Sequence, residues 1–208
     1  MIGELYADSL TGAETDIEYE DGRRRPLHAT RWLEPIDGDE VMLSRCSGPT
    51  LDVGSGPGRL TVALARRGVV ALGIDVTPHA VRLTRLAGGM ALCRDVFGPV
   101  PGAGRWTTAL LADGNIGIGG DPPALLRRMR ELVRPGGEVI AELAPPGAPT
   151  RAERVRLRRG TVTGPWFRWA DVSVSDVSRL AHDTGFTVTT CDEASGRWFA
   201  CLRRTHRA

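Results

Sequence analysis

Leu51-Asp52-Val53-Gly54-Ser55-Gly56-Pro57-Gly58-Arg59-Leu60 is the stretch that predicts how the rest of the chain is organised. Residues 50–53 are typical of a short buried strand, three glycines alternate after it, and residues 60–67 are typical of a helix. Glycine tolerates positive φ and lets a ligand approach the backbone. A helix N-terminus favours polar or anionic ligand groups. The stretch therefore predicts a small-ligand platform, and the alternative is a tight turn that holds no ligand.

The spacing of the glycines separates the ligand classes. A dinucleotide site needs G-x-G-x-x-G, but here Arg59 stands at the third position and Gly58 comes one residue early. A P-loop needs a lysine, and the chain contains none. The remaining pattern, Asp-x-Gly-x-Gly-x-Gly from Asp52, resembles motif I of the class I S-adenosylmethionine-dependent methyltransferases. In that family the glycine turn passes under the methionine part of the cofactor.

Two more carboxylates follow at the ends of predicted strands. Residues 69–75 form a continuous apolar run that ends in Asp75, and ligands of doubly wound sheets bind at the carboxyl ends of strands. The resemblance implies that Asp75 binds the ribose hydroxyls; the alternative is an aspartate that only caps the next helix. It also implies that Asp95, after the strand 90–96, bonds the adenine amino group and that Val96 packs on the ring.

Residues 107–112 predict the fourth strand, and its following loop contains Asp113-Gly114-Asn115. In the family this strand end faces both the sulfonium and the acceptor. The loop lacks the Asn/Asp-Pro-Pro-Tyr/Phe motif of adenine-specific DNA methyltransferases, so DNA base methylation is disfavoured. Asn115 is the only asparagine; it is expected to bind the acceptor or to occupy a left-handed backbone position, unless it is an ordinary turn residue.

From residue 49 onward, strand and helix patterns alternate, which predicts a parallel sheet covered on both faces. The fold class is α/β, a three-layer doubly wound seven-stranded sheet, mostly parallel with the last strand antiparallel. Arg134-Pro135-Gly136-Gly137 before the strand 138–143 is another pattern of the family. The glycine- and proline-rich residues 97–105 predict that the helix between strands three and four is missing. We expect an N-terminal cap segment (1–48) and one methyltransferase domain (49–208) with an insertion at 144–170.

The insertion and the cap are expected to meet the acceptor. Residues 153–158 alternate in polarity, and residues 165–169 could pair with them in a hairpin near the end of strand five. Trp166 and Trp169 are predicted to line an acceptor wall, or else to cover the sheet edge. In the cap, the run 23–25 is a solvated arginine patch, or one of its arginines or His28 meets the cofactor carboxylate or the acceptor.

Composition excludes several function classes. The net charge of +2 is too small to indicate nucleic-acid binding. No apolar run is long enough to span a bilayer, and residues 1–5 lack the order of a signal peptide, so a cytoplasmic location is expected. The four cysteines and four histidines do not cluster, which predicts no metal site. The tail 203–207 is expected to be mobile.

The resemblance implies methyl transfer from S-adenosyl-L-methionine, with S-adenosyl-L-homocysteine as product and no metal. The expected acceptor is a small molecule, with bacterial secondary metabolism as context; a homodimer is left open. The alternatives are an RNA or protein methyltransferase and a cofactor-binding protein without catalysis. A hydroxyl acceptor would need a base, for which Asp113 and His28 are the candidates. The residues expected to contact the cofactor are Asp52, Gly54, Ser55, Gly56, Gly58, Asp75, Val76, Asp95, Val96, Ala112 and Asp113.

Overall fold

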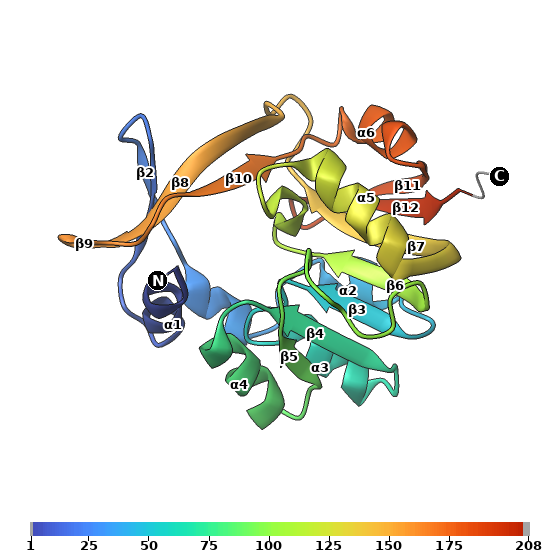
Figure 1. The fold of residues 1–208 in the computed structure, drawn as a ribbon, viewed down its shortest axis with the longest axis horizontal. Helices are drawn as coiled ribbons and strands as arrows, with labels where there is room; N and C mark the ends of the chain where they lie inside the picture. The colour runs from blue at the N-terminus through green and yellow to red at the C-terminus, as the bar shows by residue number, and fades with distance from the viewer. Residues whose placement is uncertain (1, 206–208) are drawn as a thin grey trace.

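A computed structural model describes residues 2–205 of the chain. Its centre is a seven-stranded sheet of order β11-β12-β7-β6-β3-β4-β5 (Figure 1). The strands are β3 (Thr50–Val53), β4 (Ala71–Asp75), β5 (Ala91–Cys93), β6 (Trp106–Leu111), β7 (Val133–Leu143), β11 (Phe186–Ala194) and β12 (Arg197–Arg204). The strands β7, β6, β3, β4 and β5 pair in parallel. Strand β12 is antiparallel to both of its neighbours, β7 and β11. The predicted seven-stranded sheet with an antiparallel last strand is confirmed.

Helices cover both faces of this sheet because successive strand residues point to opposite sides. Leu51 and Val53 of β3 pack into a core with α5 (Pro122–Leu132) and α6 (Val177–Asp183). On the other face, Leu110 of β6 packs with α2 (Asp39–Leu43) and α3 (Arg59–Arg66). A smaller apolar cluster joins α4 (Pro78–Leu86) to α1 (Ile2–Leu10) and the 3-10 helix η1 (Ala29–Leu33).

A second, antiparallel sheet stands beside the first (Figure 1). It pairs the N-terminal strands β1 (Asp16–Tyr19) and β2 (Arg24–Pro26) with the insertion strands β8 (Arg151–Arg159), β9 (Val162–Thr163) and β10 (Phe167–Asp171). The sequence predicted the cap and the hairpin as two separate features. The structure joins them, because β1 pairs directly with β8.

Local differences from the predicted elements are small. No helix lies between β5 and β6, as the glycine-rich residues 97–105 predict. The predicted turn 134–137 lies within β7, where the pairing with β6 shifts register. Helix α1 was not predicted at all. Of the expected mobile tail, residues 203 and 204 belong to β12, while His206 and Arg207 lie outside the described residues.

Gly58 shows why the glycine turn has its spacing. Its φ is +91°, and a Cβ there would lie 2.4 Å from Cγ2 of Thr84 on α4. The glycine therefore lets the start of α3 approach α4 closely. Gly58 does not line the cavity described below. The structure gives it a role in helix packing, and its predicted contact with the cofactor stays a prediction.

Gly58→Ala and Gly88→Ala form a matched pair. Both positions have φ near +90°, but a Cβ at Gly88 would meet nothing within 4 Å. Both variants carry the cost of a left-handed alanine, and Gly58→Ala adds an overpacking cost of about 1–3 kcal/mol. Urea unfolding should show Gly58→Ala as the less stable variant by that amount. Equal stabilities would contradict the close approach of α3 and α4.

Candidate functional site

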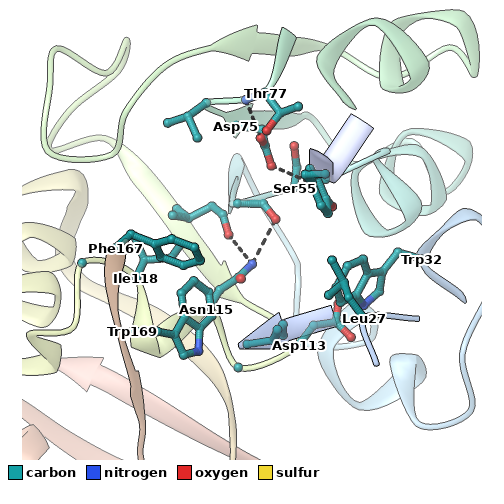
Figure 2. Close-up of a pocket in the computed structure, with 18 of the residues that line it drawn as sticks. Leu27, Trp32, Ser55, Asp75, Thr77, Asp113, Asn115, Ile118, Phe167 and Trp169 are labelled. Atoms are coloured by element: carbon teal, nitrogen blue, oxygen red, sulfur yellow. Dashed lines mark hydrogen bonds between the residues drawn. The ribbon is translucent and has the colours of Figure 1, made fainter. Parts of the chain in front are cut away.

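A cavity of about 720 Å³ opens at the carboxyl ends of β3, β4, β6 and β7 and is closed by the second sheet and residues 25–32. Its volume lies in the range of small-molecule sites, about 300–1,000 Å³. Figure 2 shows Asp75 and Ser55 at one end, Phe167 and Trp169 along one side, and Trp32 on the opposite side. The strand order reverses between β4 and β6 around β3, the place where doubly wound sheets bind ligands.

Asp75 lies at the end of β4, where the sequence predicts it. Its Oδ2 accepts a hydrogen bond from the Gly56 amide at 3.0 Å, and its Oδ1 accepts one from the Thr77 amide at 2.7 Å. Burial raises the pKa of this carboxyl, while the two amides oppose the shift. Each carboxylate oxygen has a further lone pair, so Asp75 both stabilises the glycine turn and can accept hydroxyl groups of a ligand. The helix-capping alternative and the ligand role are therefore compatible.

Asn115 connects the loop after β6 to the glycine turn. Its Nδ2 donates to the carbonyl oxygens of Val53 at 2.9 Å and Gly54 at 3.0 Å. A Cβ at Gly54 would lie 2.7 Å from that nitrogen. The left-handed residues of this loop are Asp113, with φ +52°, Gly114, Gly119 and Gly120, and Asn115 is not among them. The left-handed alternative for Asn115 is therefore wrong, and its amide nitrogen holds the two loops together. Asn115 also lines the cavity, and its contact with an acceptor stays a prediction.

Asp52 is buried on the face of β3 opposite the α5 core. Its Oδ2 accepts a hydrogen bond of 2.7 Å from the Thr61 hydroxyl on α3. Burial raises the pKa of Asp52 to about 6, although the Thr61 hydroxyl and the nearby Arg59 charge oppose the shift. Asp52 therefore links β3 to α3, the two elements that flank the glycine turn.

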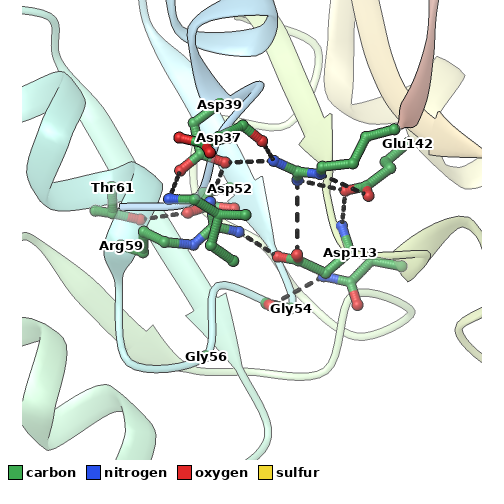
Figure 3. A network of polar contacts seen from close by, with 12 residues as sticks. Asp37, Asp39, Asp52, Gly54, Gly56, Arg59, Thr61, Asp113 and Glu142 are labelled. Atoms are coloured by element: carbon green, nitrogen blue, oxygen red, sulfur yellow. Dashed lines mark hydrogen bonds and ion pairs between the residues drawn. The ribbon is translucent and has the colours of Figure 1, made fainter. Parts of the chain in front are cut away.

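Two buried arginines and three carboxylates form a network at the base of the cavity (Figure 3). Arg59 pairs with Asp39 and, at 2.5 Å, with Asp113. Arg197 of β12 pairs with Asp39 at 2.9 Å and with Glu142 at 2.7 Å. Their side chains are between 6% and 18% exposed. Three carboxylates against two guanidinium groups give this network an excess of one negative charge.

Asp113, a predicted catalytic residue, is tightly held in this network. Its backbone amide donates to Glu142 at 2.6 Å, and its carboxylate contacts Arg59. The pKa of Asp113 is raised, because the effect of burial exceeds the opposing effect of the Arg59 and Arg197 charges. A carboxylate paired with arginine loses that pairing when it accepts a proton, so this position suits electrostatic support better than proton transfer.

The side of the cavity away from Asp75 contains apolar and aromatic side chains from the second sheet, the loop after β6 and the segment after β2. Phe167 and Trp169 of β10 lie near Ile118, and Leu27 lies across from them (Figure 2). Trp166 was predicted to join Trp169 there, but it does not line the cavity. Its ring lies 4.5 Å from the Arg156 guanidinium instead. Trp166 and Trp169 point in different directions because side chains three residues apart along an extended chain lie on opposite sides.

Ala112 is also outside the cavity lining. It is 3% exposed and packs in the core with α2 and α3. The other predicted cofactor residues, apart from Gly58, line the cavity; they are Asp52, Gly54, Ser55, Gly56, Asp75, Val76, Asp95, Val96 and Asp113. Asp95 is exposed, and one of its oxygens accepts from the Phe97 amide.

The N-terminal segment adds Tyr6, which sequence reasoning missed. A Cβ at Gly56 would lie 3.0 Å from the Tyr6 hydroxyl. Burial and the charges of Asp75 and Asp113 raise the pKa of Tyr6, so it stays a neutral donor. The apolar spacing at residues 2, 5, 6 and 10 fits a helix and could have revealed it. His28 and Arg25 also line the cavity, and Arg25 donates to the Tyr19 hydroxyl at 2.8 Å.

Within residues 2–205, no group of three or more His, Cys, Asp or Glu side chains could hold a metal ion. Over the same residues, no helix has the length and apolar character to cross a membrane.

Known proteins with similarity to this chain include methyltransferases. No family model matches the chain. The ubiquinone biosynthesis O-methyltransferases of Xanthomonas campestris pv. campestris and Xanthomonas oryzae pv. oryzae are 27% and 26% identical to it, over 78% of this chain and 78% of each relative.

Solved structures are similar in fold. A SAM-dependent methyltransferase from Bacteroides fragilis, in complex with S-adenosyl-L-homocysteine, has a TM-score of 0.81 at 21% identity and covers 98% of this chain and 94% of its own. The Burkholderia thailandensis 1,6-didemethyltoxoflavin-N1-methyltransferase has a TM-score of 0.59 at 18% identity, over 80% of this chain and 74% of its own.

Asp52→Asn should change how stability depends on pH. Between pH 4 and 6 the folded protein holds a proton on Asp52 that the unfolded chain has released, because the folded pKa is near 6 rather than 3.8. As the pH rises from 4 to 6, the wild-type free energy of unfolding should therefore fall, relative to that of the variant, by up to about 1.4 kcal/mol per pH unit. Urea unfolding at several pH values measures it. The exposed Asp183→Asn is the control, and parallel curves for wild type and Asp52→Asn would refute the prediction.

Arg59→Met should destabilise the protein by about 3–5 kcal/mol at pH 7, because it leaves two buried carboxylates without their shared partner. The control is Arg67→Met, whose guanidinium pairs with Glu40 at the exposed surface and whose loss should cost about 0–1 kcal/mol. Chemical unfolding of both variants tests this; a similar small loss in each would show that the network contributes little.

Proposed function

We propose that this chain, a class I S-adenosylmethionine-dependent methyltransferase, methylates a hydroxyl oxygen of a small, largely apolar ring compound. The observation that supports this most is a single cavity that joins Asp75 and the glycine turn to a wall of Phe167 and Trp169. Its curated relatives are named O-methyltransferases of ubiquinone biosynthesis. We therefore propose a ring hydroxyl as the acceptor, and the secondary-metabolism context expected from the sequence stays a prediction.

The residues at the Asp75 end of the cavity fit the cofactor. Asp75 would hold the ribose hydroxyls, since both of its oxygens can accept a further hydrogen bond. Asp95 and Val96 would hold the adenine ring, as the resemblance implies. Tyr6 would meet the methionine part, because no hydrogen bond occupies its hydroxyl within residues 2–205. When bound, S-adenosylmethionine supplies a methyl group activated by a positively charged sulfur.

The residues of the chain contribute alignment and charge. The buried network adds one negative charge beside the cavity, and Asp52 and Asp75 add more, which favours a cationic ligand in a partly water-excluded site. Asn115 holds the loop after β6 against the glycine turn, and the Asp113 amide holds the same loop against Glu142 of β7. These contacts fix the two sides that must align the reacting groups.

The arginines of the second sheet support a small acceptor rather than RNA. Glu18 contacts Arg156 at 2.7 Å, Arg24 at 3.4 Å and Arg158 at 3.5 Å. Arg154 pairs with Glu20. Guanidinium groups that already pair with carboxylates are less available to phosphates.

Calorimetry with S-adenosylmethionine, S-adenosylhomocysteine and NAD tests the cofactor site. The first two should bind and NAD should not. Asp75→Ala should weaken S-adenosylmethionine binding by about 1–3 kcal/mol, from a lost charged hydrogen bond. Glu131→Ala, on the outer face of α5, is the control, and thermal unfolding checks that both variants fold. Binding of NAD alone, or unchanged affinity in Asp75→Ala, would count against the proposed site.

A further inference from the structure

One carboxylate in the cavity differs from all the others. Asp171, the last residue of β10, lines the cavity and is half-buried. Within residues 2–205, no hydrogen bond or ion pair engages its side chain. The other carboxylates of the lining are each engaged, namely Asp52 by Thr61, Asp75 by two amides, Asp95 by the Phe97 amide, Asp113 by Arg59, Glu142 by Arg197, and Glu153 by Arg23 and Arg151.

The charged residues around Asp171 do not pair with its carboxylate in residues 2–205. Arg151 lies directly across from it in the β10–β8 register, but the Arg151 guanidinium pairs with Glu153 at 3.0 Å. The further charged groups on the surrounding elements are Arg168 on β10 and Glu142 at the end of β7, and Glu142 is occupied by Arg197. A half-buried carboxylate without a partner loses solvation without compensation, which is a cost that a proton-accepting role explains.

The position of Asp171 suits the acceptor rather than the cofactor. Phe167, Trp169 and Asp171 alternate along β10 and line the cavity, as residues on one face of a strand do. Arg168, between them, is also part of the lining. Trp169 forms a bridge with Ile118 in the loop after β6. The Ala144 amide, just beyond β7, donates to the Val172 carbonyl at 2.9 Å. The end of β10 therefore lies against the ends of β6 and β7, where methyl transfer is expected.

The two bases predicted from the sequence are less suitable. Asp113 would have to give up its 2.5 Å contact with Arg59 to accept a proton. His28 is exposed and follows Leu27 in the chain, and Leu27 lies on the side of the cavity opposite Phe167 and Trp169 (Figure 2). We propose that Asp171 is the catalytic base that accepts the hydroxyl proton of the acceptor, and that the adjoining Trp169 positions the acceptor ring. This proposal rests on the proposed function.

The proposed methyl transfer needs only the acceptor, S-adenosylmethionine and Asp171. The acceptor oxygen forms the new O–CH3 bond, and the S–CH3 bond breaks with its electron pair remaining on sulfur, which becomes neutral. The hydroxyl proton passes to a carboxylate oxygen of Asp171 and then to solvent. General-base assistance of this kind contributes about 10²–10⁴-fold to a rate.

The test uses the full chain with S-adenosylmethionine and a probe set of catechol, 4-alkylcatechols and 2-alkylphenols. Asp171→Asn should lower kcat by about 10²–10⁴-fold and leave cofactor affinity by calorimetry unchanged. The defect should shrink as pH rises and the probe hydroxyl ionises without help. In Asp171→Ala, added formate should restore part of the activity. Glu20→Gln, whose carboxylate pairs with Arg154 outside the cavity, is the charge-loss control.

Trp169→Ala and Trp166→Ala are the matched pair for the acceptor wall. The first should raise the acceptor KM at least tenfold, and the second should not, because Trp166 lies outside the cavity. Should Asp171→Asn fail to fold by thermal unfolding, Asp171→Ser replaces it in the same assay.

The outcomes distinguish the role of Asp171 from the proposed acceptor class. Activity of Asp171→Asn within threefold of wild type, an equal loss in Glu20→Gln, or a loss of the same size at every pH would overturn the role of Asp171. A large, pH-dependent loss in His28→Asn instead would assign the base to His28. A wild-type protein that binds S-adenosylmethionine but methylates no ring hydroxyl would overturn the proposed acceptor class, and the role of Asp171 with it.

Discussion

The buried pairing of Arg59 and Arg197 with Asp39, Asp113 and Glu142 holds together the parts of the molecule that surround the cavity. These five residues come from the N-terminal segment, the start of α3, the loop after β6, the end of β7 and the last strand. Burying such charges is costly unless each finds partners of good geometry. Because each arginine contacts at least two carboxylates, the network is stable only when all five segments are in place. The cavity and the fold are therefore stabilised together.

The same network sets the electrostatic character of the site. Its excess carboxylate and the burial of Asp52 and Asp75 favour a positive ligand charge, and burial raises the pKa of both aspartates. A cationic cofactor placed there would stabilise their charged forms. The acceptor side is different, since Phe167 and Trp169 are apolar and aromatic. One cavity thus has a charged end that suits a methyl donor and an apolar end that suits a ring compound.

Much of the cofactor side could be predicted from the sequence, because each prediction depended on residues close together in the chain. Asp75 ends its strand and lies in the cavity, and the glycine turn leads from β3 into α3 as its spacing indicates. The acceptor side was harder. Trp166 and Trp169 are three residues apart. Trp169 belongs to β10, whose pairing with β8 directs it toward the cavity, whereas Trp166 precedes the strand and lies outside the cavity lining. Gly58 matched a motif but serves the packing of α3 against Thr84.

The sequence by itself determined the strand–turn–helix at residues 50–66, the carboxylates at the ends of strands and the alternation of strands and helices, since near neighbours dictate these features. Only the tertiary structure decided that the N-terminal hairpin and the insertion form one sheet, as in the bond between Glu18 and Arg156 across 138 residues. It alone decided which carboxylates are paired and that Asp171 has no partner among residues 2–205. Pairing depends on distances between segments remote in the chain, and local spacing carries no information about those distances.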